Sequence, residues 1–239
     1  MPEKPQQEHQ EKTREKRKND PSRDIARKLW ILPALILVGA LISVWQPVSL
    51  NALLTWGREL SANPVFIGAI VLTMVLMFSF GLPGSFAVWL IAPFQPPLIA
   101  TALLVTGSVL GALGAYAFSR RLRGDWQPAG LAGRVVQLLE RRGGVMTQTA
   151  LRILPGFPHS VINFAGGLLL LPLMAFTVSA IVGLTVKWGV YATAVHGLAD
   201  AVESGQAMQA STLYPLLILS ALLLAGAWAR ARLEAQAAP

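Results

Sequence analysis

The sequence contains no cysteine and few charged residues. Without cysteine the chain can form neither a disulfide nor a cysteine-ligated metal site. Charged residues occupy 13% of the 239 positions, against about 25% in soluble domains, whereas 54% of the positions are hydrophobic. This composition indicates an integral membrane protein. The three histidines (His9, His159 and His196) are too scattered to form a metal cluster, so we expect no metal and no other cofactor.

Acidic residues and catalytic motifs are missing from the apolar stretches. No Asp or Glu lies in any membrane segment that the apolar runs indicate. The sequence offers no set of nucleophile, base and orienting group, so we do not expect an enzyme. It also lacks a Gly-rich loop ending in Lys and Ser or Thr, so we expect transport without ATP.

The net charge of +8 is concentrated in polar flanks. Nine of the 20 Lys and Arg residues precede residue 29, and six more lie within residues 119–147. Basic flanks on the cytoplasmic side follow the positive-inside rule and attract anionic lipid headgroups. No nucleic-acid recognition fold accompanies the charge, so we expect membrane lipids as partners and not nucleic acid. Residues 1–28 should form a disordered, basic cytoplasmic tail.

Apolar runs predict four crossing helices, each long enough or nearly long enough to span the hydrocarbon core. They cover residues 30–46, 98–118, 173–195 and 213–229. The first lies in a region, residues 29–63, that also contains a short external segment. The last lies in residues 196–239, after an external loop and before a short C-terminal tail.

Two further helical patterns carry information about packing. Residues 130–142 alternate apolar and charged side chains at helical spacing, which predicts an amphipathic helix on the inner membrane surface, with a partner-binding helix as the alternative. In the 98–118 span, Gly107, Gly111 and Ala115 share one face with Ser119, and small residues let another helix approach closely. This face serves internal packing or a homo-oligomer equally well.

Two proline-containing breaks interrupt the apolar runs, at residues 81–85 and 154–158. The tripeptide Leu-Pro-Gly occurs in both, at residues 82–84 and 154–156. Proline cannot continue a helix without losing a backbone hydrogen bond, and a broken backbone at membrane depth must be covered by protein or a wet cavity. All basic segments fall inside if residues 65–93 form a hairpin entering from outside and residues 145–170 one entering from inside.

The expected fold is therefore an all-α polytopic membrane protein with two inverted re-entrant helical hairpins and about four crossing helices. Both termini should be cytoplasmic, in the cell (inner) membrane.

The stretch from Arg152 to Pro158, with Asn163 and Gly166-Gly167, resembles the arginine–proline–proline–asparagine–glycine pattern of the DedA superfamily, specifically its VTT-domain (SNARE-associated Golgi protein) branch. The first half adds Gly81-Leu82-Pro83-Gly84 and a glycine-rich helix ending in Arg120-Arg121. The resemblance covers roughly residues 60–195 and implies a domain at residues 64–195 that moves phospholipids or undecaprenyl phosphate. Many of these proteins carry a carboxylate after the first Pro-Gly, where this chain has Ser85, so proton coupling through a carboxylate is not expected.

Arg152 is the leading candidate for binding a lipid phosphate. A guanidinium at the membrane centre costs about 2.5–3.5 kcal/mol, and its planar fork suits a phosphate. Arg152 snorkelling to the inner interface is the alternative. Lys187 is a second candidate phosphate contact, or snorkels outward beside Trp188 and Tyr191. Asn163 would bind the ligand or pair with backbone carbonyls freed by the prolines.

His159 is a candidate proton site, with a structural role as the alternative. The remaining site residues should shape the hairpins: Pro83, Gly84, Pro155, Gly156, Pro158, Gly166 and Gly167.

Together these features predict a membrane lipid transporter with scramblase- or flippase-like movement of phospholipid or polyprenyl phosphate, acting in membrane homeostasis. One alternative is a gradient-coupled transporter of a small solute or ion. The other is a membrane scaffold that acts through residues 130–142 and the basic tail.

Overall fold

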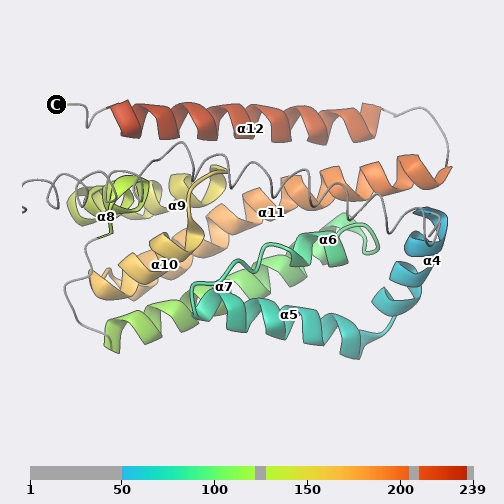
Figure 1. Cartoon of the computed structure of the whole chain (residues 1–239), viewed down its shortest axis with the longest axis horizontal. Coiled ribbons are helices and arrows are strands. Elements are labelled where there is room, and N and C mark those ends of the chain that lie inside the picture. Colours follow the sequence, from blue (N-terminus) through green and yellow to red (C-terminus); the bar gives the residue numbers. More distant parts are fainter. Residues whose placement is uncertain (1–49, 122–127, 205–209, 236–239) are drawn as a thin grey trace, which may run out of the picture. The chain divides into compact units, whose positions relative to one another are not determined.

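The computed structural model describes residues 50–121, 128–204 and 210–235, and their regular secondary structure is entirely helical. The expected tail (residues 1–28) and first span (residues 30–46) lie outside these described residues. The chain divides into two compact units, Met1–Leu53 and Leu54–Pro239. The arrangement below is that of the second unit, whose helices are shown in Figure 1.

Three helices are long and apolar enough to cross a membrane. They are α7 (Pro97–Arg121), α11 (Leu173–Ser204) and the stretch Leu213–Leu233 of α12 (Ala210–Ala235). A fourth candidate is a bent pair, in which Thr55–Ser61 and Pro64–Ser79 meet at 87°. The all-helical, membrane-compatible fold expected from composition is thus confirmed for the described residues.

The first broken segment comprises α4 (Leu50–Ser61), α5 (Pro64–Ser79) and α6 (Ala87–Ile91). Asn63 starts α5 as its N-cap, because its side chain accepts a hydrogen bond from the Val65 backbone N–H at 2.9 Å. After α5 the chain turns at Gly81, whose φ of 76° lies in the left-handed region that favours glycine. No helix forms again until α6, after the first Leu-Pro-Gly.

The second broken segment comprises α8 (Gly130–Arg142), α9 (Val145–Ile153) and α10 (His159–Leu168). Between α9 and α10 the chain turns at Gly156, which has a φ of 90°, and Pro158 then caps α10. In Figure 1, α9 and α10 both extend from their break toward the end of the unit that holds α8. The first break is arranged the opposite way, since α5 and α6 extend toward the end that holds α4.

Glycines on α7 set the distance to α5. A Cβ atom added at Gly111 would lie 2.6 Å from the Cβ of Phe78 and 3.1 Å from the carbonyl oxygen of Val75, so the two backbones touch. Gly107 meets Met74 of α5 in the same way. The small-residue face of this span therefore packs internally, which decides between the two uses that its sequence allows.

The same contact recurs between α11 and α9. A Cβ atom added at Gly183 would lie 2.8 Å from the Cβ of Arg152 and 3.0 Å from the carbonyl oxygen of Thr149. Gly183 follows Gly111 by 72 residues, the same separation as the two Leu-Pro-Gly tripeptides. In this repeated contact, Arg152 takes the place that Phe78 occupies in the first half.

Gly166 and Gly167, which are expected from the sequence to shape the second hairpin, lie inside α10. A side chain at Gly166 would strike the ring of Phe176, and one at Gly167 would strike Ser119 and the backbone of α7. Their role is close packing of α10 on its neighbours, because only a bare backbone fits there.

α11 extends beyond the span expected for residues 173–195. It continues to Ser204, so much of the predicted external loop at residues 196–211 is helical. A 32-residue helix is about 48 Å long, more than the roughly 30 Å hydrocarbon core, so one end can project into water. His196 and Asp200 form an i,i+4 pair at 3.4 Å on this extension, and such a pair supports a helix in water.

Candidate functional site

Arg152 lies in the last turn of α9 and is completely buried, with an exposed fraction of 0%. Its guanidinium carbon is 4.7 Å from the centre of the Phe176 ring, so the ring face attracts the charge. Its Nη1 donates a hydrogen bond of 2.9 Å to Oδ1 of Asn163 on α10. The side chain therefore points into the protein, and does not snorkel toward an interface.

The rest of the Arg152 guanidinium has no partner in the described part of the chain. Both Nε and Nη2 are buried and make no hydrogen bond there. These two nitrogens form one edge of the guanidinium plane, and their parallel N–H groups are the fork that binds two oxygens of a phosphate or carboxylate. Asn163 thus fixes the group by Nη1 and leaves the fork edge free.

Lys187 and His159 form the second part of the site. Lys187, on α11, is only 7% exposed, and its Nζ contacts Nε2 of His159 at the start of α10. The ammonium must donate in this bond, so His159 Nε2 accepts and Nδ1 carries the ring proton. That Nδ1 is also buried without a partner among the described residues. Lys187 lies inside the protein, although it also contacts Trp188 and Tyr191, at 4.9 and 5.9 Å from their ring centres.

Arg152, His159 and Asn163 border one small pocket, and Lys187 contacts His159 without being part of the lining. The pocket is lined by Phe78, Ser108, Arg152, His159, Asn163, Leu184 and Trp188. Its walls come from α5, α7, α9, α10 and α11. Both helix pairs that make the repeated glycine contact, α5 with α7 and α9 with α11, therefore contribute. Trp188 Nε1 donates a hydrogen bond of 2.8 Å to Ser108 Oγ and ties α11 to α7 beside the pocket.

Among the described residues that line it, the pocket has positive charge and no carboxylate. The sequence has no Asp or Glu between Glu59 and Asp125, or between Glu140 and Asp200, and every pocket residue falls in these two intervals. Buried charges are normally paired, because an isolated ion loses its hydration. Two buried cations, together with three buried nitrogens that have no partner in the described part of the chain, are chemically suited to an anion.

Other predicted site residues have roles in packing or in backbone conformation. Gly84 lies under the Phe78 ring, where an added Cβ atom would be 3.1 Å from two ring carbons. Pro155 is buried, and its carbonyl oxygen lies against Gly226 of α12. Gly156 is exposed and meets no neighbour within 4 Å, so its requirement is the left-handed φ alone.

Four lining residues were not predicted as site residues: Phe78, Ser108, Leu184 and Trp188. The 72-residue offset gives no signal for Phe78, because it relates Arg152 to Phe80 (152 − 72 = 80). Ser108 and Trp188 carry no such signal, since their hydrogen bond joins positions 80 residues apart.

Comparison with known proteins does not identify the chain. No family model matches it, and no curated protein or solved structure does so either.

Proposed function

We propose that this chain is a multi-pass membrane protein that lets a phosphate-bearing lipid cross the bilayer, in the manner of a scramblase or flippase. The observation that carries the proposal is the buried Arg152 with its free fork edge and no carboxylate nearby. An uncompensated guanidinium is costly inside a membrane protein, and such residues mark substrate pathways. A lipid phosphate supplies the missing charge and the missing acceptors.

In this proposal the two broken segments are re-entrant hairpins. The segment at residues 65–93 enters from outside and the segment at residues 145–170 enters from the cytoplasm, so the breaks meet near the midplane. The opposite directions of α5–α6 and α9–α10 in Figure 1 support this arrangement, as do the positive φ values of Gly81 and Gly156. Both termini are cytoplasmic and the membrane is the inner membrane of the cell.

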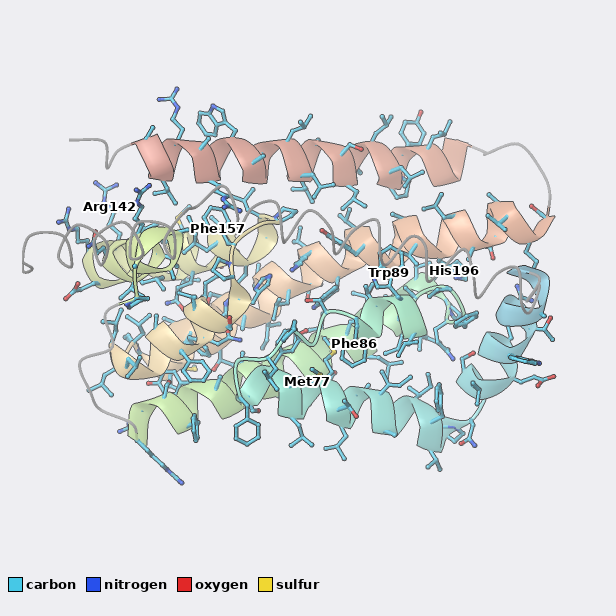
Figure 2. All side chains as sticks on the ribbon, in the orientation of Figure 1. Met77, Phe86, Trp89, Arg142, Phe157 and His196 are labelled. Atoms are coloured by element: carbon cyan, nitrogen blue, oxygen red, sulfur yellow. The ribbon has the colours of Figure 1, made fainter. Side chains whose placement is uncertain are left out.

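The basic surface residues support the same orientation. Figure 2 shows Arg142 on α8 toward one end of the unit and His196 on α11 toward the other. Arg120, Arg121 and Arg142 are exposed or end their helices, which suits contact with anionic headgroups of the inner leaflet. α8 buries Val135 and Leu139 against the protein, so its apolar side is already occupied.

Each pocket residue then has a role. Arg152 binds two phosphate oxygens through Nε and Nη2, Lys187 binds another oxygen, and Asn163 holds the guanidinium in place. His159 orients Lys187 and remains the candidate proton site. The acyl or prenyl tails stay in the lipid, where exposed apolar side chains of α11 and α12 provide the surface. The resemblance of residues 152–167 to the DedA superfamily points to lipid movement as well.

Lipid movement in proteoliposomes tests the proposal. Fluorescently labelled phospholipid should cross the bilayer faster with the parent protein than in empty vesicles, and Arg152→Ala should remove most of the gain. Arg152→Lys keeps the charge but loses the fork, so an intermediate rate is expected. Arg142→Ala is the matched control, because it removes an exposed arginine on α8. If Arg152→Ala moves lipid as fast as the parent, the assignment is wrong.

A small anion is the second candidate substrate, because the free edge of the Arg152 guanidinium would also bind a free ion. Uptake of a soluble anion such as inorganic phosphate, with no change in lipid asymmetry, would favour this alternative.

A scaffold role makes a third prediction: deletion of residues 1–28 would abolish function while Arg152→Ala would not.

A further inference from the structure

We infer that the affinity of the pocket for a ligand rises with the negative charge of the ligand's phosphate group. A phosphate monoester such as phosphatidate binds best, a net-anionic diester such as phosphatidylglycerol binds less well, and a zwitterionic diester such as phosphatidylethanolamine binds least. This inference rests on the proposed anion site and adds the class of headgroup that the site prefers.

The first argument is the charge of the site. Arg152 lines the pocket, and Lys187 contacts His159, which also lines it, so two positive charges lie at or next to the pocket. His159 is a neutral acceptor toward Lys187. A dianionic monoester leaves the occupied pocket neutral, whereas a monoanionic diester leaves one positive charge uncompensated. Low dielectric surroundings make this difference larger than it would be in water.

The second argument is the number of free donors. Nε and Nη2 of Arg152 and Nδ1 of His159 are unpartnered, and the Lys187 ammonium has three donors of which His159 takes one. A monoester offers three terminal oxygens, and a diester offers two. The third oxygen gives the His159–Lys187 side a terminal acceptor while the guanidinium fork binds the other two.

The third argument concerns the amine of a zwitterionic headgroup. Aromatic faces can bind an ammonium group, but three of the rings around this site already contact the protein's own cations. Arg152 lies over Phe176, and Lys187 lies over Trp188 and near Tyr191. An amine entering beside the phosphate therefore meets like charge, which disfavours the zwitterion.

The wall of the pocket that comes from the first half offers no acceptor or charge to the headgroup amine. The first half contributes Phe78, which is only 5% exposed and packs against Gly84, and Ser108, which already accepts a hydrogen bond from Trp188. Phe78 stands where the repeated contact has Arg152 in the second half. The pocket is thus cationic on one side and uncharged on the other.

Binding of short-chain lipids to the full-length protein in detergent tests the ranking. The probes are dioctanoyl phosphatidate, phosphatidylglycerol and phosphatidylethanolamine, at about pH 8, where a phosphate monoester is dianionic. Isothermal titration calorimetry should give affinities that fall in this order, by about tenfold or more at each step. Equal affinity for the three lipids would overturn the inference.

Two variants put a carboxylate into the pocket from opposite sides. Asn163→Asp keeps the acceptor for Arg152 Nη1, and Ser108→Asp keeps an acceptor for Trp188. Each should weaken phosphatidate binding by tenfold or more and narrow its advantage over phosphatidylethanolamine. Asn63→Asp makes the same amide-to-acid change at the N-cap of α5, where Asp also caps well, and should leave the ranking unchanged. If Asn63→Asp narrows the ranking equally, or if neither pocket variant changes it, the pocket is not the selective site.

The outcomes separate this inference from the proposed function. If all three lipids bind equally well and cross the membrane, the transport proposal stands and the inferred order of affinities is wrong. If the lipids bind in the inferred order but none crosses the membrane, the order of affinities stands and the transport proposal is wrong. Soluble glycerol phosphate shows whether the lipid tails contribute to binding. If it competes with phosphatidate at comparable concentration, a free phosphate monoester is sufficient for binding. If it competes only weakly, the lipid tails are required. Failure of every monoester to bind would overturn the inference itself.

Discussion

The Cβ atom of Arg152 lies against the bare backbone of Gly183, in the space that any side chain at position 183 would need. This contact sets how closely α9 approaches α11, and so where the guanidinium enters the pocket. The fold contains the same contact between Phe78 and Gly111. One glycine thus places a cation, and its counterpart places an apolar ring.

Gly183→Leu should destabilise the protein by about 1–3 kcal/mol, because the added side chain must displace Arg152 or the backbone of α9. Thermal unfolding in detergent measures the effect. Gly68→Ala is the control, since position 68 on α5 has no neighbour within 4 Å of an added Cβ atom. It should be neutral or stabilise by up to about 1 kcal/mol, as alanine favours helix over glycine. Equal losses for both variants would contradict the close contact.

Asn163→Leu should destabilise the protein by about 1–3 kcal/mol, because it leaves the Nη1 group of Arg152 buried without an acceptor. Asn163→Asp should retain stability, since its carboxylate accepts the same bond and carries the opposite charge. Chemical denaturation in mild detergent can compare the two. A leucine variant as stable as the parent would show that the amide does not hold the guanidinium.

The hydrogen bond from Trp188 to Ser108 should give a measurable coupling. Trp188→Phe and Ser108→Ala each remove it, and the double variant should be more stable than the sum of the single losses predicts. A neutral hydrogen bond contributes about 0.5–1.5 kcal/mol, which is the expected interaction free energy. A coupling of zero would mean that α7 and α11 are held beside the pocket by apolar packing alone.

Cysteine labelling can test whether the two broken segments enter the membrane from opposite sides, as proposed, because the parent chain has no cysteine. Ser85→Cys, near Pro83, should react with a membrane-impermeant maleimide added outside the cell. Ser160→Cys, near Pro155, should react only when the reagent reaches the cytoplasmic side. Both are conservative exchanges at positions that are not fully buried. Labelling of both from the same side would refute the inverted arrangement.

Local sequence was sufficient for features that depend on one stretch of chain. Prolines and glycines at positions 81–85 and 154–158 remove backbone hydrogen bonds or permit a positive φ, so the breaks were predictable. The long apolar runs were equally clear, because a crossing helix satisfies its own backbone. The extent of α11 was missed, since its polar end resembles a loop in composition yet pairs His196 with Asp200 on one helical face.

The sequence by itself determined the membrane composition, the positions of the breaks, and the presence of Arg152, Lys187 and His159 without a carboxylate in their apolar surroundings. Only the tertiary structure decided that Arg152 and His159 meet Asn163 and Trp188 around one pocket, and that Lys187 contacts His159. The reason is that helix periodicity and chain breaks act over a few residues. The meeting of five helices depends instead on glycine contacts and hydrogen bonds between positions far apart in the chain.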